Sequence, residues 1–144
     1  MAFGAPYLPT MNKQREDALD LLDLKPGQKI IELGSGDGRM LNSAAKRGIY
    51  SVGYELNPIL FVISWVATIK YRKFITIKYG DFWRKKWPQT DGIFVFLHTR
   101  FMKKLDKKII REYKGSKIKV VSYAFEIPGK KAVKRKDAMF LYIF

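Results

Sequence analysis

The stretch IIELGSGDG, residues 30–38, predicts the beginning of an α/β fold. Ile30 and Ile31 belong to a short apolar run that is typical of a buried strand, and three glycines interrupt it before a helical pattern starts at Arg39. Because glycine has no Cβ, a ligand can approach the backbone here, and the N–H groups of the following helix can bind a carboxylate. Glu32 could hold a cationic amine at the same place. A tight turn between strand and helix is the alternative explanation of the glycines alone.

The alternation of strand and helix continues outward from this stretch. Strands are expected at residues 28–33, 51–56, 74–79, 92–97, 117–125 and 138–144, and helices at residues 11–24, 39–47, 58–71 and 101–113. Thr10 is the expected N-cap of the first helix, and the apolar residues 59–69 are expected to form a buried helix. This order predicts a mostly parallel, doubly wound sheet of the Rossmann-like kind. No long helix separates the last two strands, so the final strand should return to the sheet edge as in a hairpin.

Length and composition predict one compact domain over residues 1–144, with an N-terminal element and helix in residues 1–24 and the sheet core in residues 25–144. Cysteine is absent and His98 is the single histidine, so thiolate and histidine metal clusters are not expected. The first ten residues lack a charged start followed by an apolar core, which makes the cytoplasm the expected compartment. The apolar residues 59–69 are too few to span a bilayer, which takes roughly 20 residues.

Two further acids extend the candidate site beyond the glycine loop. Glu55 ends the second expected strand, where a carboxylate can accept both hydroxyls of a ribose, and Asp81 follows the third, where it can accept from an adenine amino group. Each acid alone is more often a surface or capping residue. Together with Glu32, they bring an acid to one sheet edge from three successive strands, which favours a ligand with an adenosine and an amino-acid-like end.

A nicotinamide dinucleotide is the obvious rival ligand, since its sites also use glycines and an acid after the second strand. Its fingerprint is G-x-G-x-x-G, whereas Gly34, Gly36 and Gly38 give G-x-G-x-G with Arg39 in the sixth place. The rest of the chain also lacks the substrate domain that a dehydrogenase usually needs. The spacing therefore favours a sulfonium cofactor.

Four motifs resemble the seven-strand class I methyltransferases, and more narrowly the small lysine methyltransferases related to those acting on mitochondrial adenine nucleotide translocase and the ATP synthase c-subunit. The motifs are PYLPT at residues 6–10, ELGSGDGR at 32–39, GYELNP at 53–58 and DFW at 81–83. The resemblance implies an S-adenosyl-L-methionine-dependent methyltransferase. It implies cofactor binding by the three glycines and the acids after strands two and three, and the candidate cofactor residues are Glu32, Gly34, Gly36, Asp37, Gly38, Glu55, Asp81 and Phe82.

Two departures from those families limit what the resemblance implies. The mitochondrial enzymes carry an N-terminal hydrophobic targeting segment, whereas this chain begins almost at Pro6 and looks like a compact prokaryotic-type relative. Organelle and membrane-substrate assignments therefore do not carry over. After the fourth strand, residues 96–99 read FLHT in place of the Asn/Asp-Pro-Pro-aromatic motif of many enzymes that methylate DNA bases or glutamine.

Tyr7, Trp83 and His98 are the candidate catalytic residues. Tyr7 and Trp83 are candidates to line the acceptor site, where aromatic faces can orient a lysine amine, and His98 is a candidate proton acceptor. Ordinary packing is the alternative role for the two aromatics, and a structural role is the more common one for a lone histidine. Tyr123 is a further candidate proton acceptor, ranked no higher than His98.

The net charge of +15 leaves three functions open. Methylation of a protein lysine is the first, and it would require an acidic face around the target, because a basic surface repels lysine-rich proteins. Methylation of RNA is the second, since basic segments interleaved with aromatics suit phosphates and stacked bases. A basic binding module without activity is the third, although the intact glycine and acid positions argue against it.

Overall fold

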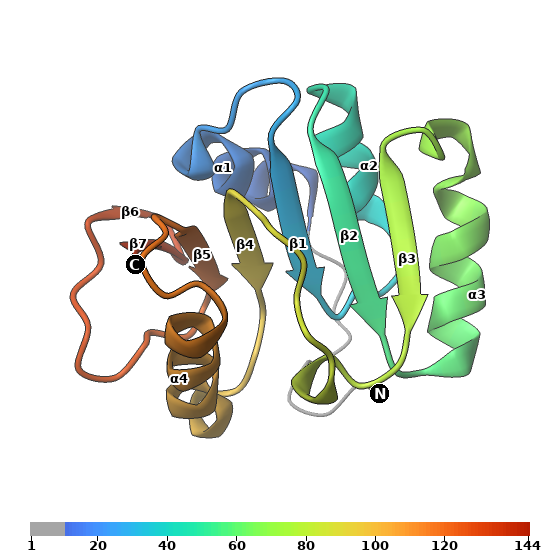
Figure 1. The fold of residues 1–144 in the computed structure, drawn as a ribbon. Coiled ribbons are helices and arrows are strands. Elements are labelled where there is room, and N and C mark those ends of the chain that lie inside the picture. The colour runs from blue at the N-terminus through green and yellow to red at the C-terminus, as the bar shows by residue number, and fades with distance from the viewer. Residues whose placement is uncertain (1–10) are drawn as a thin grey trace.

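A seven-stranded sheet organises residues 11–144, the part of the chain that the computed structural model describes (Figure 1). The strands are β1 (Lys29–Leu33), β2 (Tyr50–Glu55), β3 (Ile75–Tyr79), β4 (Gly92–Val95), β5 (Lys119–Tyr123), β6 (Lys134–Lys136) and β7 (Met139–Ile143), in the order β3-β2-β1-β4-β5-β7-β6. The first five run parallel, and β7 pairs antiparallel with both β5 and β6. The carboxyl ends of β1 to β5 therefore share one edge, at the bottom of Figure 1.

Helices cover both faces of the sheet, as the doubly wound prediction requires. They are α1 (Asn12–Leu22), α2 (Arg39–Lys46), α3 (Pro58–Ala67) and α4 (Met102–Glu112), with short 3₁₀ turns η1 (Ile69–Tyr71), η2 (Phe82–Arg84) and η3 (Thr99–Phe101). Alternate residues of each strand face opposite sides. Thus Ile31 belongs to the core under α4, whereas Ile30 belongs to the core under α1 and α2.

The C-terminal strands differ from the prediction in one respect. The last strand does return antiparallel to β5, but it does not form the edge of the sheet, because β6 pairs along its outer side. The residues of β6 are Lys134, Arg135 and Lys136, which are all exposed and show no apolar alternation. A strand of this kind forms through its pairing with β7, and its cations protect the sheet edge from pairing with other chains.

The expectation of a buried helix over residues 59–69 is wrong. In α3 only Ser64 is buried, while Ile59, Val62 and Val66 are exposed to solvent at 70%, 57% and 57%. The inward side of the helix is narrow, because Ser64 and Thr68 lie directly against the glycine loop at Gly38. Apolar composition indicated a helix that avoids water, but of its apolar residues only Leu60 and Phe61 are as much as half-buried.

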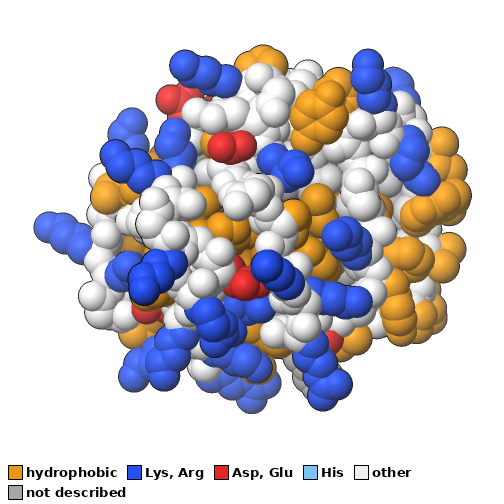
Figure 2. Space-filling model, viewed as in Figure 1, with side chains coloured by type: hydrophobic (Ala, Val, Ile, Leu, Met, Phe, Trp, Pro, Cys, Tyr) orange, Lys and Arg blue, Asp and Glu red, His pale blue; other side chains and the backbone are white. Residues whose placement is uncertain are grey.

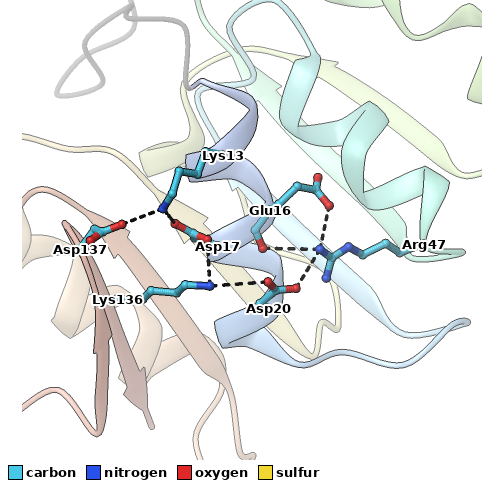
Figure 3. Close-up of polar contacts among 7 residues, drawn as sticks. All are labelled: Lys13, Glu16, Asp17, Asp20, Arg47, Lys136 and Asp137. Carbon is cyan, nitrogen blue, oxygen red and sulfur yellow. Dashed lines mark hydrogen bonds and ion pairs between the residues drawn. The ribbon is translucent and has the colours of Figure 1, made fainter.

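A network of ion pairs fixes α1 to the C-terminal strands and to the end of α2 (Figure 3). Lys13 Nζ lies 2.9 Å from both Asp17 and Asp137, and Lys136 Nζ lies 3.0 Å from Asp17. The hydrogen bonds from the two lysines lower the pKa of Asp17. Arg47, at the end of α2, pairs with Glu16 and Asp20, which lie one turn apart on α1. Thr10 lies outside the described residues, and the N-cap position belongs instead to Met11, which makes no side-chain cap.

Candidate functional site

The glycine loop leaves the carboxyl end of β1 and enters α2 through three left-handed residues. Gly34, Gly36 and Gly38 have φ values of 89°, 55° and 84°, a region that side chains with a Cβ rarely adopt. A Cβ on Gly38 would also lie 2.8 Å from Thr68 Cγ2, just after α3. Gly38 therefore has a structural reason to be glycine. The backbone N–H of Gly36 points at a carboxylate.

That carboxylate belongs to Glu55, which lies at the end of β2 and is only 2% exposed. Its Oε1 accepts from Gly36 N at 2.9 Å, and its Oε2 accepts from Asn57 N at 3.0 Å. Asn57 in turn caps α3 by accepting from the N–H groups of Ile59 and Leu60. Glu55 thus holds the glycine loop and the start of α3 together, and each of its oxygens keeps a further lone pair for a ligand hydroxyl.

Glu32 lies on β1 with 7% of its surface exposed, and its Oε1 has no hydrogen-bond partner among residues 11–144. Burial, followed by the nearby carboxylates of Asp37 and Glu55, raises the pKa of Glu32 well above its usual value. A buried carboxyl group without a partner is costly, and a bound cation would remove that cost. The structure thus brings together three of the predicted acids around one unpaired oxygen.

The other predicted cofactor residues already have structural partners. Asp37 Oδ1 accepts from the backbone N of Arg39 at 3.1 Å, and its Oδ2 pairs with the Arg39 side chain at 2.9 Å, so Asp37 orders the entry to α2. Asp81 Oδ1 accepts from Trp83 N at 2.9 Å and caps η2. Phe82 is buried in the core cluster under α4. A cofactor contact of these three residues stays a prediction.

Two of the three candidate catalytic residues lie at the same edge of the sheet, and Tyr7 lies outside the described residues. Trp83 is half-buried against Phe82 and Phe101, with ring centroids 4.8 and 6.4 Å apart, and Lys104 Nζ lies 4.6 Å from its ring centroid. Its indole Nε1 is buried without a hydrogen-bond partner among residues 11–144. His98 is exposed just after β4, and its ring lies 5.7 Å from that of Phe125.

Phe96 and Phe125 are members of this edge that the sequence reasoning missed. The Phe96 ring lies 4.9 Å from Tyr123 and 6.0 Å from Phe125, so aromatic side chains from β4 and β5 meet at the strand ends. Ala124 adopts a φ of 69°, unusual for a residue with a Cβ, as the chain turns between Tyr123 and Phe125. The sequence signal that could have predicted this group is the presence of an aromatic residue just after each of two adjacent parallel strands.

A cavity of about 450 Å³ opens beside this aromatic group, lined by His98, Thr99, Arg100 and Phe125. Lys and Arg side chains gather around the lower part of the molecule in Figure 2, where the strands end and α4 lies. The exposed cations here come from the end of η2 and the segment after it, and from η3 and α4, and they are Arg84, Lys85, Lys86, Arg100, Lys103, Lys104 and Lys107. The edge is therefore acidic and buried at the glycine loop, but basic and aromatic at its rim.

Neither a metal centre nor a membrane-spanning helix is found within residues 11–144. No three of the described histidine and acidic side chains are grouped so that they could hold a metal ion. No described helix combines the length and the apolar composition needed to cross a membrane.

Comparison with known proteins gives concordant matches. Residues 32–134 match the ANTKMT methyltransferase domain. The chain is 32% identical over 130 residues to the ATP synthase c-subunit lysine N-methyltransferase of Homo sapiens, covering 85% of this chain and 53% of that protein. It is 28% identical over 150 residues to a protein-lysine N-methyltransferase of Saccharolobus islandicus, covering 96% of this chain and 92% of the relative. The chain thus spans about half the length of the human relative.

Solved structures share the fold at lower sequence identity. The crystal structure of an RNA methyltransferase from Salinibacter ruber, in complex with S-adenosyl-L-homocysteine, superposes with a TM-score of 0.82 at 20% identity and covers 95% of this chain and 92% of that chain. A methyltransferase from Geobacter sulfurreducens in complex with the same molecule gives a TM-score of 0.67 at 19% identity, covering 87% of this chain and 54% of that chain. These likenesses establish the Rossmann-like fold of class I methyltransferases.

Proposed function

The chain belongs to the ANTKMT methyltransferase domain family, and we propose that it is an S-adenosyl-L-methionine-dependent enzyme that methylates lysine side chains of proteins. The observation that carries this proposal is the buried Glu32 carboxyl group beside Asp37 and Glu55, whose Oε1 has no hydrogen-bond partner among residues 11–144. A cationic ligand would offset the mutual repulsion of these carboxylates. The relatives named as protein-lysine N-methyltransferases support the acceptor.

The described residues fit a ligand with an ammonium group, a ribose and an adenine. Glu32 would accept from the ammonium group, Glu55 from the ribose hydroxyls and Asp81 from the adenine amino group. The turn at Gly36 keeps the backbone of the loop free of side chains along the ligand. S-adenosyl-L-methionine would supply a methyl group bound to a sulfonium sulfur, and this sulfur would leave as a neutral thioether. The protein's task is then mainly to align donor and acceptor.

The acceptor amine must lose its proton before methyl transfer, and the rim of the site favours this deprotonation. Arg100 and Lys104 are cations on the exposed rim, and like charges lower the pKa of an incoming lysine. The half-buried Trp83 and the Phe96–Phe125 pair offer apolar faces for its methylene chain. His98, exposed at the mouth of the cavity, would accept the released proton at a ring nitrogen.

The same rim bears on the choice of substrate. Its exposed lysines and arginines would repel a basic protein, so we expect the target lysine to lie among acidic residues. RNA is the second candidate acceptor, because a cationic surface next to half-buried aromatic rings also suits phosphates and bases.

Incubation of the protein with radiolabelled methyl donor and host extract, followed by protease or ribonuclease digestion, distinguishes these acceptors. We expect label that protease releases and ribonuclease does not. A Glu32→Gln variant should transfer little label, while Asp23→Asn, which changes an exposed acid at the opposite edge of the sheet, should transfer as much as the wild type. Label released by ribonuclease would reassign the acceptor, and no label with any extract would refute the proposal.

A further inference from the structure

Helix α3 exposes most of its apolar residues to solvent, whereas an ordinary surface helix buries them. Its fully buried positions are polar: Ser64 Oγ donates to Phe61 O at 3.0 Å, and Thr68 Oγ1, just after the helix, donates to Ser64 O at 2.8 Å. Its outward stripe is apolar and continues into η1 at the i, i+3, i+4, i+7 and i+10 spacing of one helix face. The exposed residues of this stripe, called the α3 face here, are Ile59, Val62, Ile63, Val66 and Ile69.

The α3 face forms a continuous apolar patch on the surface. Figure 2 shows hydrophobic side chains in a band along the right margin of the molecule, where Figure 1 places α3. Scattered apolar residues on a surface are ordinary, but a contiguous patch marks a binding surface. Nothing within residues 11–144 covers it, since each of the five side chains is at least 44% exposed.

The surroundings of the α3 face carry charge of one sign. From Leu56 to Gly80 the sequence contains no aspartate or glutamate. It contains four exposed cations: Lys70, Arg72 and Lys73 follow α3, whereas Lys78 lies near the Tyr54 ring on the opposite face of the sheet. Arg72 donates to Trp65 O at 3.0 Å, and its guanidinium lies 4.1 Å from the centroid of the exposed Trp65 ring. The apolar stripe is thus accompanied by an exposed tryptophan and followed by three exposed cations.

We propose that the α3 face docks on the surface of a lipid bilayer that contains anionic phospholipids. The apolar stripe would enter the boundary between headgroups and acyl chains, and Lys70, Arg72 and Lys73 would lie against the negative headgroups. Tryptophan and arginine are suited to headgroup depth, where Trp65 and Arg72 would lie together. Ten residues of helix measure about 15 Å, which is enough to lie in the interface and too short to cross it.

Charge argues against a second copy of the chain as the occupant. A two-fold contact places the same patch of both subunits together, so Lys70, Arg72 and Lys73 of one copy would meet the same three cations of the other. A bilayer brings negative charge along the whole length of the helix instead. Docking would also bring the catalytic edge near the lipid surface, because the N-cap of α3 is Asn57, two residues after Glu55. This inference goes beyond the proposed methylation and does not depend on it.

Vesicle binding by the whole chain tests the proposal without any methyl transfer. We expect the protein to float with vesicles of phosphatidylcholine and phosphatidylglycerol, and to bind vesicles of phosphatidylcholine alone at least about tenfold more weakly. Brominated acyl chains should quench the fluorescence of Trp65, since Trp83 and Trp87 are less exposed. A Trp65→Phe variant should bind and lose that quenching. Quenching that persists in Trp65→Phe would show another face on the lipid and overturn the proposal.

Matched variants locate the contact on the α3 face. Val62→Ser with Val66→Ser should lower the vesicle partition coefficient by at least about tenfold, because two exposed apolar side chains no longer leave water. The control, Ile110→Ser with Val133→Ser, changes residues of similar exposure, 51% and 56%, and should bind like the wild type. Circular dichroism checks that both variants fold.

Two outcomes of the same series would overturn the proposal. Equal partitioning of the α3 double variant and the control would remove the α3 face from the contact. Sedimentation that shows a dimer lost only in the α3 double variant, without vesicle binding by the wild type, would assign the face to self-association instead.

Discussion

Replacement of Glu32 by glutamine separates a ligand-binding role from a structural one. The raised pKa of Glu32 means that the ligand-free protein holds this carboxyl group largely neutral over a range above its ordinary pKa of 4.5. Glutamine is neutral and of the same shape, so the ligand-free variant should be as stable as the wild type or more stable. Binding is different, since an ammonium group needs the charged form. The loss of one charge-assisted hydrogen bond costs about 1.5–3 kcal/mol, which raises Kd roughly 10- to 150-fold.

The pH dependence of this prediction has a defined sign. Because the folded protein holds the Glu32 proton more tightly than the unfolded chain, Glu32 removes stability as the pH rises from 4.5 towards its raised pKa. A cationic ligand opposes this by favouring the ionised form, so wild-type affinity should increase with pH over the same interval and binding should release a proton. The Glu32→Gln variant should show neither effect.

Calorimetric titration with S-adenosyl-L-homocysteine, in buffers of different ionisation enthalpy, measures affinity and proton release together. Urea unfolding of the ligand-free protein measures stability, and Asp23→Asn is the control for a general change in charge. Unchanged affinity of Glu32→Gln would refute the assignment of this carboxyl group to the ligand. Unchanged affinity together with lower stability would show that Glu32 has a structural partner.

Four further substitutions test other parts of the structure. Glu55→Gln should lower the free energy of unfolding by about 1–3 kcal/mol, because an amide cannot accept both backbone N–H groups, and should also weaken S-adenosyl-L-homocysteine in the titration. Gly38→Ala should cost about 1–3 kcal/mol in urea unfolding, since its φ is 84° and its Cβ would meet Thr68 at 2.8 Å. Asp17→Asn should lower Tm at neutral pH and flatten the acid limb of stability, because the lowered pKa of Asp17 gives stability that is lost as the pH falls below its ordinary value of 3.8. Tyr7→Ala should lose most methyl transfer with little change in cofactor affinity, and a wild-type transfer rate would make the residue a structural anchor.

The parallel strands and the glycine loop could be predicted because their signals are local. Apolar runs of strand length, followed by glycines or by Pro58, give the strands and their ends within a few residues. The position of Glu55 and Asp81 at one edge then follows from parallel pairing alone. The second role of Glu55, as the acceptor that joins the loop to α3, could not be predicted, because it depends on where two backbone N–H groups point.

The features that the sequence did not predict share a physical cause. Each is determined by contacts with neighbouring elements rather than by the local composition of the chain. Residues 59–69 were correctly expected to be helical, but their burial depends on how much of the helix the sheet covers. Strand β6 exists only through β7, and its three cations would suit a loop as well. The approach of Phe125 to Phe96 depends on the left-handed backbone of Ala124, which alanine does not signal.

Identification of the methylated atom tests the central claim most directly. The purified chain is incubated with labelled S-adenosyl-L-methionine and host extract, and the labelled product is hydrolysed and analysed by mass spectrometry. We predict methylated lysine from a protein with acidic residues around the modified site, and a strong loss of it with Glu32→Gln. Label recovered only in methylated nucleosides, or in no product at all, would contradict the assignment of this chain as a protein-lysine methyltransferase.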